Sequence, residues 1–261
     1  MLELRGLTKV YNVFPAVDRL TFSIAPSEVI GLLGPNGAGK STTIKMLAGL
    51  LEPTEGSIYY GGKNVLKNLY DFKKKLGYVP EQSEIYPHLS ALDYLLMVGR
   101  LRNIPEKVLR VRIDELMRLF HLSAEMDLPI SSYSKGMVQK VLISAALLHD
   151  PEILLLDEPL SGLDVTTSMV MKDLVRKLAA AGTTIIYSSH VLEVVEKICA
   201  RSIIIHKGKL VADDTVDNLR SLMHQPSLEK VFSQLVVEED TEAVAQGIVE
   251  AIKYGRPERR P

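Results

Sequence analysis

Hydrophobic and polar residues alternate along the first part of the chain, as is typical of half-buried β-strands. Three segments show this period of two, at residues 2–11, 16–25 and 56–65, and Pro, Gly and Asn turns separate them. Between the second and third, residues 28–34 (EVIGLLG) form a continuous apolar run that suits a strand buried on both faces. A Gly-rich turn and an amphipathic helix at residues 41–51 follow. The pattern therefore predicts a buried strand that leads through a tight turn into a helix.

The middle and the end of the chain follow other patterns. Residues 89–148 have the apolar spacing of helices, with few strand signals. Strands and helices then alternate again, at residues 152–157, 166–181, 183–189 and 191–200. The segment RSIIIHKGKLVADD predicts a hairpin that turns at Lys207–Gly208, and weak helices with a charged tail follow from about residue 215. This order indicates an α/β core with a helical insertion.

Composition narrows the class of protein. Of 261 residues, 46 % are hydrophobic and 24 % charged, as in ordinary folded domains, and the net charge of −1 gives no basic excess for binding nucleic acid. The single cysteine, Cys199, cannot form an intramolecular disulfide and is expected to be a buried thiol in a reducing, cytoplasmic setting. No window approaches the roughly 20 apolar residues of a membrane span, so we expect any membrane association to come through a partner.

The turn after the buried strand carries a phosphate-binding motif. Its sequence, GPNGAGKST, matches G-x-x-x-x-G-K-[ST] and stands between a predicted strand and a predicted helix, which favours nucleotide binding over an ordinary glycine-rich turn. The glycines allow backbone N–H groups to point at phosphate oxygens, Lys40 can reach the β- and γ-phosphates, and Ser41 can bind Mg²⁺. The predicted binding residues are Gly34, Pro35, Asn36, Gly37, Ala38, Gly39, Lys40, Ser41 and Thr42.

Two acids end the buried strand ILLLDEP. Ligands of parallel sheets bind beyond the carboxyl ends of strands, so Asp157 is expected near the phosphate loop, where it suits Mg²⁺ through a water. Glu158 points elsewhere and can orient and polarise an attacking water. Taken alone, an apolar strand that ends in two acids often has only solvated charges at its end. The phosphate loop earlier in the chain favours the functional interpretation of these two acids. His190 follows the next strand and can hydrogen-bond the γ-phosphate or the water.

These residues together resemble the ATP-binding cassette (ABC) ATPases, over about residues 2–213. The phosphate loop, ILLLDEP, SGLD at Ser161–Asp164 and His190 follow in that family's order and spacing. YSKGM at Tyr133–Met137 lies where the family places its signature motif. The resemblance implies an α/β P-loop NTPase core, a mixed sheet flanked by helices, with an amino-terminal antiparallel β subdomain and an inserted α-helical subdomain.

The resemblance also implies boundaries. The ATPase domain would span residues 1–214, with the helical subdomain inserted at about 85–150. Residues 215–261 would form a C-terminal helical extension and a charged tail. The groove that receives a permease's coupling helix would lie at Tyr78–Leu89 and the start of ALDYLLMV.

Each motif takes a role by resemblance. Tyr11 would stack on adenine, because its π face suits a base. Ser134 and Gly136, at the start of a predicted helix, would cap the γ-phosphate of ATP held by a second copy of the chain. Asp164 would contact the opposite phosphate loop, and His190 would be the switch histidine. Two ATP molecules would thus lie between two head-to-tail subunits.

The chain departs from the family at two motifs. The signature is usually LSGGQ, and Lys135 and Met137 replace a glycine and the glutamine, which leaves the ribose contact from the fifth position open. The usual position of the Q-loop glutamine falls on Glu81, with Gln82 next. Either residue can sense Mg²⁺ and the attacking water, and the spacing favours Glu81.

In these departures, and in the segment SLEKVF at Ser227–Phe232, the chain resembles ATPase subunits of bacterial ABC exporters whose permease is a separate chain. The resemblance implies a cytoplasmic subunit with ATP and Mg²⁺ as cofactors, bound to the membrane only through that permease. A soluble ABC protein that acts on ribosomes or DNA is one alternative, but such proteins typically carry two cassettes or a long coiled coil. A nucleotide-gated scaffold is another, and Glu158 argues against it.

Overall fold

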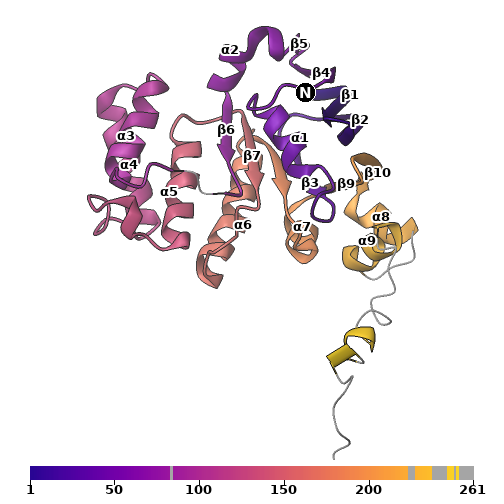
Figure 1. Cartoon of the computed structure of the whole chain (residues 1–261). Coiled ribbons are helices and arrows are strands. Elements are labelled where there is room, and N and C mark those ends of the chain that lie inside the picture. Colours follow the sequence, from indigo (N-terminus) through magenta and orange to yellow (C-terminus); the bar gives the residue numbers. More distant parts are fainter. Residues whose placement is uncertain (83–84, 223–226, 237–245, 250, 253–261) are drawn as a thin grey trace, which may run out of the picture.

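A six-stranded sheet forms the centre of the molecule (Figure 1). The computed structural model describes residues 1–82, 85–222, 227–236, 246–249 and 251–252. The strand order is β10-β9-β3-β8-β7-β6, and all pairs are parallel except β10 with β9. The strands are β3 (Val29–Leu33), β6 (Leu76–Val79), β7 (Ile153–Asp157), β8 (Thr184–Ser188), β9 (Arg201–His206) and β10 (Lys209–Thr215). Because parallel strands end at one edge, the loops after β3, β6, β7 and β8 lie together.

A second, antiparallel sheet of four strands is built from the amino-terminal part in the order β2-β1-β4-β5. Its strands are β1 (Leu2–Tyr11), β2 (Phe14–Ile24), β4 (Glu55–Tyr60) and β5 (Lys63–Asn64). The segment expected as one strand at residues 56–65 is divided by a turn at Gly61 and Gly62, whose φ angles are 56° and 76°. Two consecutive left-handed residues suit a tight hairpin. The predicted antiparallel subdomain is confirmed.

The central strand β3 separates two hydrophobic layers. Its Ile30 and Leu32 pack with α1 (Lys40–Leu47) and the four-stranded sheet. Its Val29 and Leu33 point to the other layer, with the helices of the opposite face. All five residues of the strand are buried, so the interpretation of the apolar run as a strand covered on both sides is confirmed.

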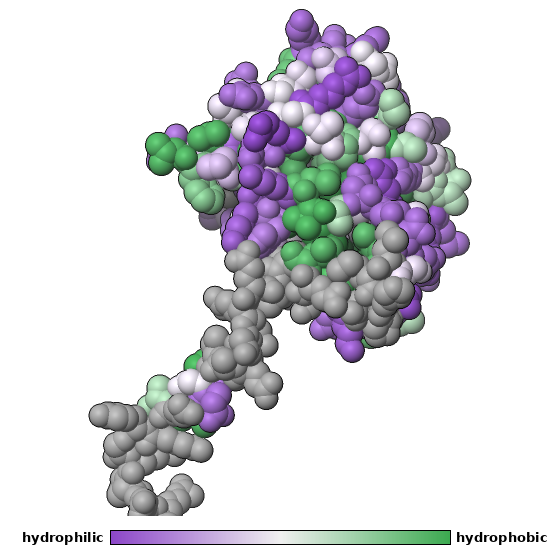
Figure 2. Space-filling model, turned by 90° about the vertical axis from the view of Figure 1, so that its right-hand side faces the viewer, coloured by the Kyte–Doolittle hydropathy of each residue, from purple (hydrophilic) through white to green (hydrophobic). Residues whose placement is uncertain are grey.

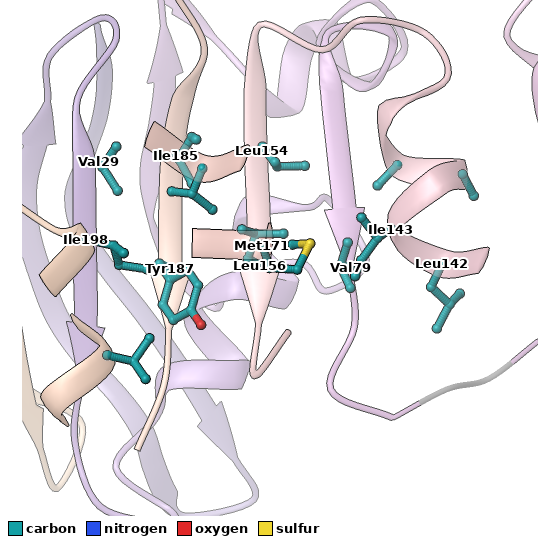
Figure 3. Packing of buried hydrophobic residues seen from close by; sticks show 14 of the residues in the cluster. Val29, Val79, Leu142, Ile143, Leu154, Leu156, Met171, Ile185, Tyr187 and Ile198 are labelled. Atoms are coloured by element: carbon teal, nitrogen blue, oxygen red, sulfur yellow. The ribbon is translucent and has the colours of Figure 1, made fainter. Parts of the chain in front are cut away.

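Helices α6 (Val165–Ala180) and α7 (Leu192–Ile198) lie on the second face of the sheet. Figure 3 shows Met171 of α6 beside Leu156 of β7, with Tyr187 of β8 in the same layer. This packing holds α6 against the sheet, directly after the loop that joins β7 to α6.

Helix α1 ends earlier than residue 51, where the apolar stripe would have continued. Gly49 adopts a left-handed φ of 63°, and its N–H donates to the carbonyl of Met46. The N–H of Leu50 donates to the carbonyl of Lys45. These two bonds form a Schellman motif, which terminates the helix regardless of the hydrophobic pattern beyond it.

Three helices form a subdomain beside β6: α3 (Ala91–Leu101), α4 (Glu106–Leu119) and α5 (Lys135–Leu147), as Figure 1 shows. They pack on one another, and α5 also packs against β6. A short 3₁₀ turn, η2 (Ile130–Ser132), precedes α5. The helical character predicted for residues 89–148 agrees with these elements.

The sequence did not predict the elements that lead into this subdomain. They are η1 (Leu66–Asn68), α2 (Leu69–Lys74) and β6. Within α2 only Phe72 is fully buried, and Leu69 packs partly buried against the same core, so this six-residue helix is too short for a helical period to be recognised.

The described carboxyl-terminal part contains α8 (Val216–Leu222) and α9 (Leu228–Val236), and α9 packs against α7. The charged tail at residues 254–261 lies outside the described residues. Figure 2 shows apolar surface between hydrophilic bands on the face that carries β10 and these helices. Across the described ranges, no helix combines the length and apolar character that crossing a bilayer requires.

Candidate functional site

The loop between β3 and α1 has a backbone that only glycine permits at several points. Gly37 and Gly39 have φ angles of 78° and 106°. A Cβ at Gly34 would lie 2.3 Å from the carbonyl oxygen of Ile205, and one at Gly39 would lie 2.5 Å from that of Ala16. Positive φ and close backbone approach together explain the glycines of the motif.

Lys40 lies at the mouth of this loop with only 7 % of its surface exposed. Its Nζ donates to the carbonyl oxygens of Gly34 at 2.7 Å and Pro35 at 3.1 Å. Burial lowers the pKa of Lys40, and the negative charges of Glu158, Asp157 and Glu81 oppose that shift. The loop thus holds a cation against its own backbone.

A cavity of about 470 Å³ opens over the loop and α1. Side chains from β2, from α1 and from the loops after β6, β7 and β8 meet there. Its lining consists of Ala16, Asn36, Gly37, Gly39, Lys40, Ser41, Thr42, Glu81, Glu158 and His190. Most residues expected at the phosphates and the attacking water are therefore gathered at one place. Ala16 was not predicted, because a small residue in a strand carries no chemical signal.

Three oxygen-bearing side chains lie on one side of the phosphate loop. Asp157 is 1 % exposed, and among the described residues its Oδ1 has no hydrogen-bond partner. Burial raises the pKa of Asp157, the hydroxyls of Ser188 and Ser41 oppose this, and the charges of Glu81 and Glu158 add to it. Ser41 Oγ donates to Glu81 Oε2 at 3.5 Å. The group offers hard oxygen ligands and excess negative charge, which suits a divalent cation.

Glu158 is held by the loop after β8. Its Oε1 accepts a hydrogen bond from the backbone N–H of His190 at 2.8 Å and lies 2.8 Å from His190 Nδ1. Its Oε2 accepts from Ser189 Oγ at 3.3 Å. The backbone of Glu158 has a φ of 50°, a strained value for this residue type. A carboxylate fixed in this way beside a cavity can orient water and accept its proton. The sequence did not single out Ser189.

The alternatives for the Q-loop position differ in placement. Glu81 lines the phosphate cavity and also an adjoining cavity of about 280 Å³ that includes Ser41 and Asp157. Gln82 is exposed and lines only the adjoining cavity, as far as the described residues show. The geometry favours Glu81.

The remaining predicted residues lie away from the phosphate cavity. Tyr11 ends β1 with 48 % of its surface exposed and Lys9 Nζ lies 5.6 Å from its ring centroid. Ser134 caps α5 by accepting from the N–H of Met137 at 3.3 Å, and Asp164 caps α6 by accepting from the N–H of Thr167 at 2.8 Å.

The residues expected to serve the adenine ring and the second subunit are thus not brought to the cavity. Within the part of the chain that is described, Tyr11, Ser134, Gly136 and Asp164 do not line it. Ser134 and Asp164 instead present the exposed starts of two helices. One chain therefore does not join these two helix starts to its own phosphate loop.

Comparisons with known proteins agree with this geometry. The family model described as "ABC transporter" matches residues 17–161. The ABC transporter ATP-binding protein NatA of Bacillus subtilis is 34 % identical over 227 residues, which cover 87 % of this chain and 92 % of NatA. Nod factor export ATP-binding protein I of Ralstonia nicotianae is 32 % identical, with 81 % of this chain and 66 % of that protein covered.

A solved structure extends the likeness to three dimensions. The ATP-binding cassette MJ0796, in a dimeric post-hydrolysis state with ADP and Pi, superposes with a TM-score of 0.77 at 26 % identity, over 82 % of this chain and 98 % of that one. The chain therefore belongs to the ABC transporter family, as an ATP-binding subunit that hydrolyses ATP to power transport.

Proposed function

We propose that this chain is the ATPase subunit of an exporter, that it closes around ATP as a head-to-tail dimer, and that it drives a separate membrane permease. The main support for the dimer is the position of Ser134 and Asp164. Both lie at exposed helix starts, away from the phosphate loop of their own chain. A helix start attracts anions, so the start of α5 can bind the phosphates of a second copy's ATP. The dimeric state of MJ0796 supports this arrangement.

The contacts support a role for each of several residues within one site. The backbone of residues 34–42 and the Lys40 ammonium bind the phosphates, and the exposed ring of Tyr11 stacks on adenine. Glu158 orients the attacking water and takes its proton. His190 fixes the Glu158 carboxylate through its backbone N–H and its ring, and it also faces the cavity where the γ-phosphate would lie.

Mg²⁺ fits the oxygen cluster beside the phosphate loop. The buried Asp157 Oδ1, which has no partner among the described residues, can bind it through a water. Ser41 and Glu81 supply a hydroxyl and a second carboxylate. The cation would neutralise negative charge on the phosphates, and these residues would hold it in position.

Glu81→Gln tests the metal assignment. We expect the Mg²⁺ concentration for half-maximal ATP turnover to rise about tenfold, because the substitution removes one of the negative charges around the cation. The Mg²⁺ titration of Glu81→Gln is compared with titrations of the parent and of Gln82→Ala, which removes the neighbouring amide. A larger effect of Gln82→Ala than of Glu81→Gln would assign the role to Gln82 instead.

A groove between the core and the helical subdomain is the proposed permease site. It has a volume of about 310 Å³ and lies between α3, α5 and the end of β6. Tyr78, Pro80, Tyr94 and Val98 line it, which agrees with the segments expected to receive a coupling helix. The likeness to the Nod factor export protein supports export rather than import. The chain would then lie on the cytoplasmic face of the membrane through its permease.

The experiment is co-purification of the tagged chain from detergent-solubilised membranes of its own cells. We expect a multi-spanning membrane protein to be retained and to stimulate ATP hydrolysis. Val98→Arg, inside the groove, should abolish both effects, whereas Val111→Arg, on an exposed position of α4, should not. Equal binding by both variants, or co-sedimentation with ribosomes instead, would contradict the proposal and favour the soluble alternative.

A further inference from the structure

The first residue of α5 reaches across to the loop that joins β7 to α6. Lys135 Nζ donates to Ser161 Oγ at 2.7 Å. The aliphatic part of Lys135 lies over Gly162, because a Cβ built there would meet Lys135 Cγ at 2.9 Å and Cδ at 3.0 Å. The lysine side chain therefore lies along the loop at residues 158–164, although part of it remains exposed to solvent.

Two more contacts join the same helix and loop. A Cβ at Gly136 would lie 2.7 Å from the carbonyl oxygen of Gly162, so the two backbones approach closely. The buried Gln139 donates from Nε2 to the carbonyl oxygen of Pro159 at 3.1 Å. Lys135 is thus one part of a continuous seam between the first turns of α5 and the loop.

The loop carries a functional residue at each end. It begins at Glu158 and ends at Asp164, the N-cap of α6. The N–H of Ser161 donates to the backbone carbonyl oxygen of Glu158 at 3.1 Å. The residue that Lys135 holds is therefore hydrogen-bonded to the backbone of the proposed general base. A movement of the start of α5 would be transmitted to Glu158 through this bond.

The position of the charge is itself informative. A cation in the first turn of a helix is disfavoured by the helix dipole, and no acid in the first turn of α5 compensates it. The contact with Ser161 and Gly162 supplies a reason for the lysine that helix stability does not.

We propose that Lys135 is a positioning residue that couples the two ATP sites of the dimer. It ties the start of α5, which faces the ATP of the second copy, to the loop that orients Glu158 at the chain's own ATP. This inference rests on the proposed head-to-tail dimer. Binding of the second copy's γ-phosphate at Ser134 would then set Glu158 through the bond from Lys135 to Ser161.

Amide hydrogen exchange on the full chain without nucleotide tests the tether. We expect the peptide spanning residues 158–164 to exchange about fivefold faster than in the parent in both Lys135→Ala and Ser161→Ala. The double variant should exchange no faster than either single variant. Lys135→Arg should stay within about twofold of the parent, because a guanidinium can also donate to the hydroxyl. The matched control is Lys107→Ala, an exposed lysine in the first turn of α4. Unchanged exchange in Lys135→Ala, or additive effects, would overturn the tether.

Steady-state turnover tests the coupling. We expect Lys135→Ala to lower kcat about fivefold, to bring the Hill coefficient for ATP close to 1 and to change KM less than twofold. Lys135→Arg should restore both kcat and the Hill coefficient. A loosened loop with undiminished cooperativity would overturn the coupling. Failure of the proposed function is a separate result, because it would appear as no turnover in the parent and no ATP-held dimer of Glu158→Gln, whereas the exchange experiment needs neither.

Discussion

Glu158→Gln is expected to lower ATP turnover by about 10²–10⁴-fold while leaving ATP bound, the range associated with loss of a general base. The amide keeps the size of the side chain, and its oxygen can still accept from the N–H of His190, so the loop is expected to stay in place. Because hydrolysis would be blocked, the ATP-bound pair should persist. Phosphate release with Mg²⁺ and size-exclusion chromatography in ATP measure the two results.

Glu193→Gln is the matched control for this substitution. Glu193 is an exposed residue of α7 that pairs with Lys197, so its loss should leave turnover unchanged. If the Glu158→Gln variant still hydrolysed ATP at the parent's rate, Glu158 would not be the general base. A parent chain that binds ATP and never hydrolyses it, even with membranes that carry its permease, would favour the nucleotide-gated scaffold.

The main parts of the site could be predicted because short-range patterns determine them. A buried strand followed by glycines and Lys40 specifies a phosphate loop from local sequence alone. Asp157 and Glu158 could be placed because parallel strands end at a common edge, whichever residues fill the rest of the sheet. The order of strands and helices then defined the α/β core.

Contacts between distant segments could not be predicted in the same way. Glu81 and Gln82 are neighbours in an irregular loop, and only the fold brings Glu81 within reach of Ser41. The left-handed backbone of Glu158 is imposed by tertiary bonds, since nothing in its own residue type favours it. The bond from Lys135 to Ser161 joins residues 26 positions apart in sequence, so the departure from the family's signature became meaningful only in the structure.

Lys40→Ala is expected to weaken ATP binding about 100-fold. The ammonium would make charge-assisted hydrogen bonds to the β- and γ-phosphates, and two such bonds are together worth about 3 kcal/mol, where 1.4 kcal/mol is a factor of ten. Titration calorimetry gives the affinity. A second readout is the rise in melting temperature that ATP causes, which should largely disappear because it depends on the ratio of ligand concentration to Kd.

The stability of the nucleotide-free fold should change little in this variant, which separates a binding defect from unfolding. The substitution removes the bonds to Gly34 and Pro35, and it also removes a cation whose burial disfavours its charged form, as the lowered pKa indicates. These effects oppose each other, so we expect a change of about 1 kcal/mol or less in urea unfolding. Lys107→Ala, an exposed lysine in the first turn of α4 that lines neither cavity, should keep both affinity and stability. Equal loss of affinity in the two variants would mean that general positive charge, and not the buried ammonium of Lys40, holds the phosphates.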